Sequence, residues 1–324
     1  MKAITCRRYG PPGVLRLEKL PRPEPGDDEV LIRVRAVEAT KGDCELRGFR
    51  FAVKWFWLPL RLVMGVRRPR RPVPGGYFAG VVERVGRAVQ TLSPGDEVVG
   101  CTNLRFGAYA EYLCLPARYP LAPKPAAMSF EAAAALPLGG LNAHHFLKLA
   151  GLAAGEHLLV NGAGGSIGAY GIQIAKALGA EVTAVDRGYK ADGLKTLGAE
   201  HVLDCDRDDF TAGGARFDVV FDMVPGSRYR DCLAVLKPGG RYVIGNPGLG
   251  KLLRAAWTSR FGGHRVGAAF APETREQLEA LIALVEDGRI SSIVDTVHPL
   301  ESAAAAHRQV EAERRVGAVV LSIP

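Results

Sequence analysis

A glycine-rich loop offers the clearest chemistry in this sequence. It follows the apolar stretch 157–161 and leads into the helical pattern of 169–178. The loop residues that could contact a ligand are Gly162, Gly164, Gly165, Ser166, Ile167 and Gly168. Glycines let backbone N–H groups approach a pyrophosphate, and the N-terminus of the following helix adds a partial positive charge. The pattern therefore predicts a dinucleotide-binding loop.

An acidic residue follows this loop at a suitable distance. The next β-like stretch, 181–185, leads to Asp186, which follows Gly168 by about the 20 residues expected of a ribose-binding carboxylate. Such a carboxylate binds a 2′-hydroxyl and repels a 2′-phosphate, whereas Arg187 and Lys190 could hold that phosphate as charged donors. The acid makes NADH the slightly favoured cofactor, and NADPH stays open.

Two rival interpretations of the same loop remain. Residues 164–168 also spell G-x-S-x-G, the nucleophile elbow of α/β-hydrolases, with Ser166 as nucleophile. The acid would be Asp218 or Asp222, and the base would be His264 or His307. The additional glycines and the acid after the second strand argue against a hydrolase. A non-catalytic protein that only binds the cofactor is the second rival.

The elements around the loop indicate an α/β protein. The 324 residues suggest two domains. Short strand patterns separated by proline and glycine dominate up to residue 116, which indicates a β-rich domain, and strands alternate with helices over 157–245, which indicates a parallel sheet. A late helix is expected over 273–287 and a last strand over 317–323.

Composition and charge exclude several classes of protein. The net charge of +8 could favour an anionic ligand, but the basic residues are dispersed and no nucleic-acid motif is present, so no nucleic-acid partner is expected. Six cysteines without a C-x-x-C pair fit a reducing compartment. The N-terminus does not resemble a signal peptide and no apolar run is long enough to span a membrane, so the cytoplasm is the expected location.

The segment 49–73 is unusual because aromatic residues at its start are followed by many arginines. It could be an inserted helix that packs its aromatic side chains on the β-rich domain, a lid over a hydrophobic substrate, or a patch that touches a membrane surface. Packing is the favoured reading and membrane contact the least favoured.

Several sequence blocks together resemble one known family. These blocks are PGGYFAGVVERVGRAVQTLSPGDEVVG at 74–100, GAYAEY at 107–112, LVNGAGGSIGAYGIQIAKALGA at 159–180 and HPLESAAAAHRQVEAERRVGAVVL at 298–321. The chain is similar to the zinc-free, quinone oxidoreductase-like branch of the medium-chain dehydrogenases/reductases, over almost its whole length except 49–73.

The resemblance implies both a fold and an activity. The fold would be a Rossmann doubly wound parallel sheet at 123–264 plus a β-rich GroES-like catalytic domain made of 1–122 and 265–324, with the substrate cleft at their junction. The activity would be hydride transfer from NAD(P)H to an enone, quinone or other small hydrophobic carbonyl compound. A homodimer is common in similar proteins.

The resemblance also implies that no zinc is bound. The catalytic cysteine of zinc-using relatives would stand three residues before Asp43, where this chain has Thr40. Their His-Glu pair is replaced by Gly76 and Tyr77, and no cysteine lies between the two at 101 and 114 to build a structural zinc lobe.

Four residues are expected near the reacting groups on the same grounds. Thr40 and Tyr77 should line the cleft, where zinc-free relatives usually carry Asn and Asp. Tyr77 could donate a proton or hydrogen bond to a carbonyl oxygen, or could serve as an aromatic wall, which is the favoured reading. Asn142 and Asn246 should lie near the nicotinamide.

Overall fold

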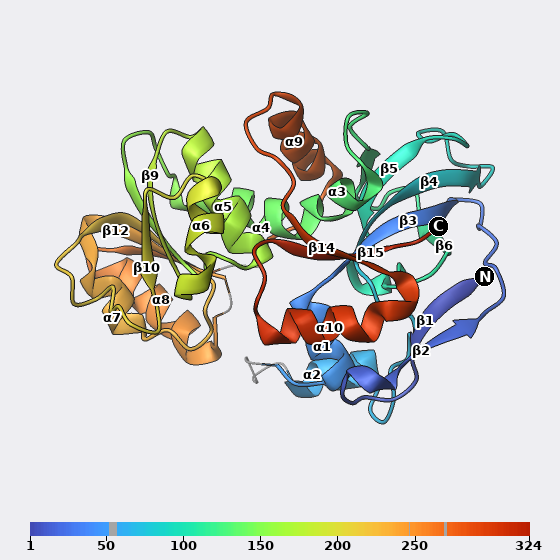
Figure 1. Cartoon of the computed structure of the whole chain (residues 1–324), viewed down its shortest axis with the longest axis horizontal. Coiled ribbons are helices and arrows are strands. Elements are labelled where there is room, and N and C mark those ends of the chain that lie inside the picture. The colour runs from blue at the N-terminus through green and yellow to red at the C-terminus, as the bar shows by residue number, and fades with distance from the viewer. Residues whose placement is uncertain (52–56, 246, 269–270) are drawn as a thin grey trace.

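The computed structural model describes residues 1–51, 57–245, 247–268 and 271–324. Figure 1 shows the parallel sheet with its helices on the left and the β-rich part on the right. The predicted α/β architecture is confirmed. No helix in the described ranges is long and apolar enough to cross a membrane.

The β-rich part contains a small and a large sheet. In the described residues, the large sheet has seven strands, and its path runs β14-β15-β3-β4-β5-β7 with β6 paired to β3. The strands of both sheets are β1 (Lys2–Cys6), β2 (Leu15–Lys19), β3 (Glu29–Ala39), β4 (Tyr77–Val85), β5 (Glu97–Cys101), β6 (Tyr112–Pro116), β7 (Leu121–Pro123), β14 (Val294–Pro299) and β15 (Ala318–Ser322). Because β15 pairs antiparallel with β3, the C-terminal end of the chain completes the sheet that its N-terminal part begins.

The second large sheet is parallel, in the order β10-β9-β8-β11-β12-β13. Its strands are β8 (His157–Asn161), β9 (Glu181–Asp186), β10 (His201–Asp204), β11 (Phe217–Asp222), β12 (Leu236–Ile244) and β13 (Arg265–Ala268). This is the doubly wound order in which the winding reverses between β8 and β11, and ligands bind at the carboxyl ends of the strands near such a reversal.

One expected domain limit needs correction. Residues 265–268 were assigned to the β-rich domain, but they form β13, which pairs with β12 in register from Arg265 opposite Arg241 to Ala268 opposite Ile244. The parallel sheet therefore extends to Ala268. The sequence did not reveal this strand because the predicted alternation of strands and helices ends at 245.

Helices cover the parallel sheet and link the two halves. The helices are α1 (Lys41–Gly48), α2 (Trp57–Met64), α3 (Phe130–Ala134), α4 (Leu136–Ala150), α5 (Ser166–Ala177), α6 (Ala191–Thr196), α7 (Tyr229–Ala234), α8 (Leu249–Phe261), α9 (Arg275–Glu286) and α10 (Ala303–Ala312). Gly139 and Gly140 let α4 pack closely, since a Cβ at Gly139 would lie 2.4 Å from the Tyr170 ring and one at Gly140 would lie 2.5 Å from Leu281. Helix α4 is thereby fitted between α5 and α9.

The segment 49–73 packs partly on the β-rich part. Phe49 is buried and its ring contacts the rings of Tyr9, Phe51 and Trp57. The guanidinium of Arg61 lies 4.1 Å from the centre of the Tyr9 ring, a cation–π arrangement. The expected packing of aromatic side chains on the β-rich part is therefore seen at Phe49, whereas no residue of α2 is buried. Trp55 and Phe56 lie outside the described residues.

Candidate active site

The predicted dinucleotide loop lies between the carboxyl end of β8 and the start of α5. Gly162 has a positive φ of 83°, which only glycine adopts without strain. A Cβ at Gly168 would lie 2.3 Å from the Gly162 carbonyl oxygen, so this position also requires glycine. Ile167 packs against the hydrophobic core. The loop can therefore adopt its tight turn only with glycine at Gly162 and Gly168.

The outer side of the loop is open to a ligand. A Cβ at Gly165, which precedes the first residue of α5, would meet no atom closer than 3.7 Å. The backbone N–H groups of the first turn of α5 have no partner within the helix, and they attract a phosphate there. The loop thus fits the pyrophosphate of a nicotinamide dinucleotide.

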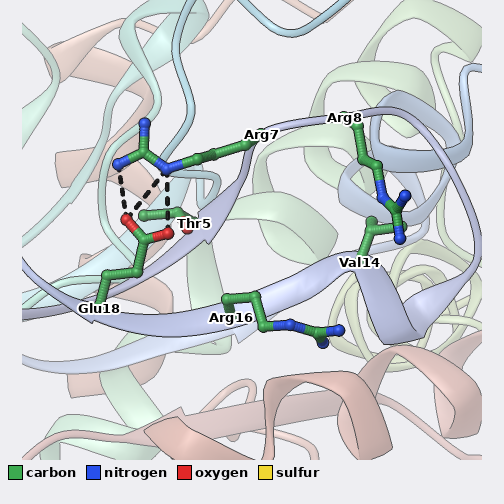
Figure 2. Close-up of a pocket in the computed structure, with 6 residues that line it drawn as sticks. All are labelled: Thr5, Arg7, Arg8, Val14, Arg16 and Glu18. Carbon is green, nitrogen blue, oxygen red and sulfur yellow. Dashed lines mark hydrogen bonds and ion pairs between the residues drawn. The ribbon is translucent and has the colours of Figure 1, made fainter.

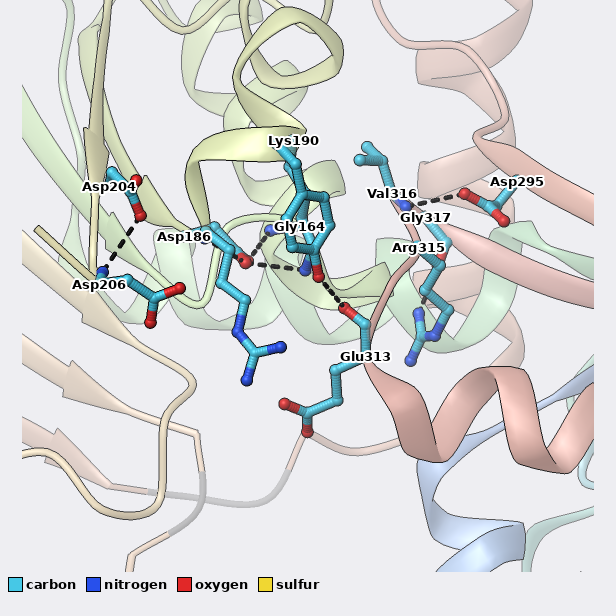
Figure 3. Close-up of polar contacts among 12 residues, drawn as sticks. Gly164, Asp186, Lys190, Asp204, Asp206, Asp295, Glu313, Arg315, Val316 and Gly317 are labelled. Carbon is cyan, nitrogen blue, oxygen red and sulfur yellow. Dashed lines mark hydrogen bonds and ion pairs between the residues drawn. The ribbon is translucent and has the colours of Figure 1, made fainter.

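Asp186 and Lys190 form a buried ion pair beside this loop, as Figure 3 shows. One carboxylate oxygen of Asp186 accepts a hydrogen bond from the Gly164 N–H at 2.7 Å, and the other accepts from the Arg187 N–H at 2.8 Å and contacts the Lys190 Nζ at 2.7 Å. Arg187 itself is exposed. Asp186 therefore holds the loop in place, and Lys190 compensates its negative charge.

The C-terminal part of the chain closes over the same loop. The Gly317 N–H donates to the Gly164 carbonyl at 3.2 Å, and the Tyr189 hydroxyl donates to the Glu313 carbonyl at 3.3 Å (Figure 3). The connection between α10 and β15 thereby joins the dinucleotide loop to the seven-stranded sheet.

Ser166 is bonded to a buried acid that the sequence analysis missed. Its hydroxyl donates to Glu38 Oε1 at 2.7 Å, and Glu38 is 1% exposed. The second carboxyl oxygen, Oε2, has no hydrogen-bond partner among the described residues. Burial raises the pKa of Glu38 to about 8, although the Ser166 hydrogen bond and the charge of Arg315 act in the opposite direction. An acid at an otherwise apolar strand position was the signal that could have revealed it.

The structure gives no support to the hydrolase interpretation. A nucleophilic serine needs a histidine base within hydrogen-bond reach. The hydroxyl of Ser166 instead bonds to Glu38, and His307 is held between Tyr109 at 3.0 Å and Arg47 at 3.2 Å. Burial lowers the pKa of His307 to about 3, so this histidine is neutral and belongs to the packed interior.

Thr40 caps α1. Its hydroxyl accepts from the Asp43 N–H at 2.9 Å and donates to Asp43 Oδ2 at 2.8 Å, and its own N–H donates to the same oxygen at 3.0 Å. Thr40 is 4% exposed. These contacts occupy the hydroxyl, so the structure favours a capping role over the catalytic role expected for Thr40. The other Asp43 oxygen accepts from the Gly75 N–H at 3.2 Å and thereby anchors the strand that leads to Tyr77.

Asn142 lies on α4, and its side-chain amide donates to the Leu138 carbonyl one turn earlier, at 2.8 Å. It is partly exposed and keeps its side-chain oxygen for other partners. The catalytic role of Asn142 stays a prediction. Asn246, the other residue expected near the nicotinamide, lies outside the described residues.

Tyr77 meets an acid that is distant in the chain. Its hydroxyl donates to Glu273 Oε1 at 2.5 Å. Tyr77 is the first residue of β4, whereas Glu273 follows the carboxyl end of β13. Burial first, and then the neighbouring Glu273, raises the pKa of Tyr77, and burial raises the pKa of Glu273. The hydrogen bond to Glu273 favours a hydrogen-bonding role for Tyr77 over a role as an aromatic wall.

The sequence predicts a helix from residue 273, which would make Glu273 an ordinary helix-start acid rather than a site residue. Helix α9 begins only at Arg275, since the Thr274 hydroxyl caps it by accepting from the Gln277 N–H. Glu273 therefore precedes the cap and can reach across to Tyr77.

Comparison with known proteins identifies the family. Residues 26–126 match the alcohol dehydrogenase GroES-like domain, and residues 197–321 match the family described as zinc-binding dehydrogenase. The chain is 31% identical to 2-methylene-furan-3-one reductase of Solanum lycopersicum and 31% identical to NADPH-dependent alkenal/one oxidoreductase of Arabidopsis thaliana, in each case over 99% of this chain and 79% of the relative. The chain belongs to the medium-chain dehydrogenases/reductases. It lies in their quinone oxidoreductase-like branch.

The three-dimensional comparison agrees with this family. The quinone oxidoreductase from Coxiella burnetii superimposes with a TM-score of 0.87 at 28% identity, covering 100% of this chain and 99% of the other. The predicted Rossmann sheet and GroES-like domain are confirmed, and this medium-chain dehydrogenase/reductase is an NAD(P)-dependent oxidoreductase.

The name of one matching family implies a zinc site. The described side chains of this medium-chain dehydrogenase/reductase do not form a set of zinc ligands. Over 1–51, 57–245, 247–268 and 271–324, no three His, Cys, Asp or Glu side chains are grouped so that they could hold a metal. At the positions where the resemblance would place ligands, Thr40 caps a helix and Tyr77 is bonded to Glu273.

An indentation on the opposite side of the β-rich part is a poor candidate site. Figure 2 shows it over β1 and β2, where Arg7 pairs with Glu18 beside Arg8 and Arg16. It contains no residue of the dinucleotide loop or of the Tyr77–Glu273 pair, so it is a feature of the basic surface.

Proposed function

We propose that this chain is a zinc-independent reductase that uses NAD(P)H to reduce enones, quinones or related small hydrophobic carbonyl compounds. The observation that carries the proposal is the position of Tyr77. A hydroxyl that could give up a proton lies at the start of β4, bonded to Glu273, which follows β13 and precedes α9. The names of the relatives, an enone-type furanone reductase and an alkenal/one oxidoreductase, support this substrate class.

The residues of the loop would hold the cofactor by its pyrophosphate. The first turn of α5 and the open side at Gly165 would face the phosphates, and Asp186 would face the adenosine ribose. When bound, the reduced nicotinamide supplies a hydride.

The protein's own contribution is placement and a proton. Tyr77 and Glu273 are both partly buried, and the Tyr77 hydroxyl would bind the oxygen of the substrate carbonyl. A positioned hydrogen-bond donor stabilises negative charge as it develops on that oxygen, without a metal ion.

The arrangement around Asp186 weakens the argument for NADH. Lys190 neutralises the carboxylate, which reduces its repulsion of a 2′-phosphate, and the exposed Arg187 offers a cation to that phosphate. We therefore propose that NADPH binds at least as well as NADH.

The test is turnover of both cofactors with a panel of substrates. An alkenal, a cyclic enone, a benzoquinone and a saturated aldehyde would be added to the protein with NADPH or NADH, with and without a chelator, and loss of the reduced cofactor followed by absorbance. We expect turnover of an enone or quinone that the chelator leaves unchanged, and weaker NADPH binding in Arg187→Glu.

Other outcomes would reject parts of this proposal. Activity that the chelator removes and zinc restores would reject zinc independence. Tight cofactor binding without turnover of any compound would favour the non-catalytic alternative instead.

We also propose a homodimer. Helix α8 exposes Leu249, Leu253, Trp257 and Phe261 at four-residue spacing, each more than half exposed. It packs beside β13, which pairs only with β12 among the described strands. An apolar helical stripe next to an open sheet edge suits a second copy of the same surface.

A further inference from the structure

The contact between Tyr77 and Glu273 joins two segments that are 196 residues apart in the chain. Tyr77 is the first residue of β4, and Glu273 stands just before the Thr274 cap of α9, so the hydrogen bond forms only when α9 is docked beside the start of that strand. In the part of the chain that the structure describes, Tyr77 is the only hydrogen-bond partner of the Glu273 carboxyl. The one described hydrogen-bond partner of Glu273 is therefore the proposed proton donor.

Among the described residues, the charged or titratable groups that influence this pair are acidic. Cys101 on β5 stands directly opposite Tyr77. The charges of Cys101 and of Glu38 on β3 both raise the pKa of Tyr77. Two effects act on the pKa of Glu273. Burial raises it, and the hydrogen bond from Tyr77 lowers it. Burial therefore makes the protonated form of Glu273 accessible at a higher pH than for an exposed glutamate.

The protonation state of Glu273 decides where the single phenolic hydrogen of Tyr77 can point. An ionised carboxylate only accepts, so Tyr77 must donate its hydrogen to Glu273. A protonated carboxyl can donate to the Tyr77 oxygen instead, and the phenolic hydrogen is then free to point at the substrate.

We propose that Glu273 is a positioning residue for the reaction, which turns the Tyr77 hydroxyl toward the substrate and returns a proton to it. This inference rests on the proposed function. In an enone, hydride addition at the β-carbon forms an enolate, and the O–H bond of Tyr77 breaks as the enolate is protonated. The Tyr77 phenolate takes the proton of the Glu273 carboxyl, and water restores that proton. The substrate gains a hydride and a proton, and the cofactor is oxidised by two electrons.

The first test compares the pH dependence of turnover in Glu273→Gln, Glu273→Asp and Tyr77→Phe, with Glu279→Gln on the exposed side of α9 as control. In the wild type, kcat should fall as pH rises through the pKa of Glu273. In Glu273→Gln, kcat should drop by about 10- to 100-fold, within the range for lost proton transfer, KM should stay within about threefold, and the fall at high pH should disappear.

The conservative and combined variants test the coupling. Glu273→Asp should keep the fall at high pH, and the double variant Tyr77→Phe/Glu273→Gln should be no slower than Tyr77→Phe alone, because both changes remove one pathway. A Glu273→Gln variant with the kcat and pH profile of the wild type would overturn the inference, as would additive losses in the double variant. Absence of turnover in the wild type would reject the proposed function itself.

A measurement on the free protein tests the inference without activity. Ultraviolet absorbance reports tyrosinate formation, and the difference between the wild type and Tyr77→Phe isolates Tyr77. In Glu273→Gln the titration of Tyr77 should move to lower pH, because a neighbouring negative charge is removed. An unchanged titration would show that the two groups are not coupled and would overturn the inference.

Discussion

At the scale of single residues, Glu38 has the most unusual environment among the described acids. It is 1% exposed, one of its oxygens has no described partner, and its other oxygen bonds to Ser166 in the dinucleotide loop. Burial disfavours the charged form, so the folded protein binds a proton at Glu38 that the unfolded chain releases. This residue therefore links the stability of the fold to pH.

Replacing Glu38 by Gln should remove that link. Because burial raises the pKa of Glu38 from 4.5 to about 8, the protonated carboxyl stabilises the wild type fully below pH 4.5, and this contribution is lost as pH rises to about 8. Above that pH, Glu38→Gln should be more stable than the wild type by on the order of a few kcal/mol, since each pKa unit corresponds to about 1.4 kcal/mol. Urea unfolding at several pH values measures the difference. Parallel stability curves for the two proteins would contradict the prediction.

At the scale of elements, the start of α1 determines where Tyr77 lies. Thr40 and Asp43 form a capping box, and Asp43 also accepts from the Gly75 N–H two residues before Tyr77. The cap thus connects the end of β3 to the beginning of β4. Thr40 thus serves as a helix cap in the structure, and its catalytic role stays a prediction.

Thr40→Ala and Thr40→Ser separate these two roles. Loss of a helix cap costs about 0.5–2 kcal/mol, so Thr40→Ala should lower the free energy of unfolding by that amount, whereas Thr40→Ser keeps the hydroxyl and the cap. Thermal unfolding should show the lower stability of Thr40→Ala. Its kcat at moderate temperature should change less than threefold. A loss of kcat beyond about 100-fold in Thr40→Ala, with stability unchanged, would restore the catalytic interpretation.

At the scale of the whole molecule, one feature joins the two halves of the chain, and another offers a surface for the proposed dimer. The C-terminal strand β15 pairs with β3, and Gly317 beside it bonds to Gly164 of the dinucleotide loop, so both sheets meet at the cofactor site. Helix α8 lies in the left half of Figure 1, away from the seven-stranded sheet, and its apolar stripe is exposed. The proposed dimer would cover that stripe and leave the junction of the sheets free.

The double variant Trp257→Ser/Phe261→Ser tests the dimer. These side chains are 66% and 69% exposed in the single chain, so their replacement should leave the fold intact but weaken self-association by at least about tenfold, as expected for the loss of large apolar anchors. Sedimentation equilibrium measures the effect, and Leu104→Ser, which is 63% exposed on the β-rich part, is the control. A wild type that stays monomeric, or a double variant that dimerises equally well, would reject this interface.

The dinucleotide loop, the alternation of strands and helices, and the family can all be predicted from the amino-acid sequence. Those features are local, because Gly162, Gly168 and Asp186 lie within one strand–helix–strand unit and their spacing follows from backbone geometry. Only the tertiary structure decided which acids face these elements. Ser166 meets Glu38 across 128 residues of chain and Tyr77 meets Glu273 across 196, and no local pattern marks such pairs. They arise because β15 closes the seven-stranded sheet next to the loop and because α9, which Thr274 caps, brings Glu273 beside the start of β4; both pairs depend on packing between distant segments.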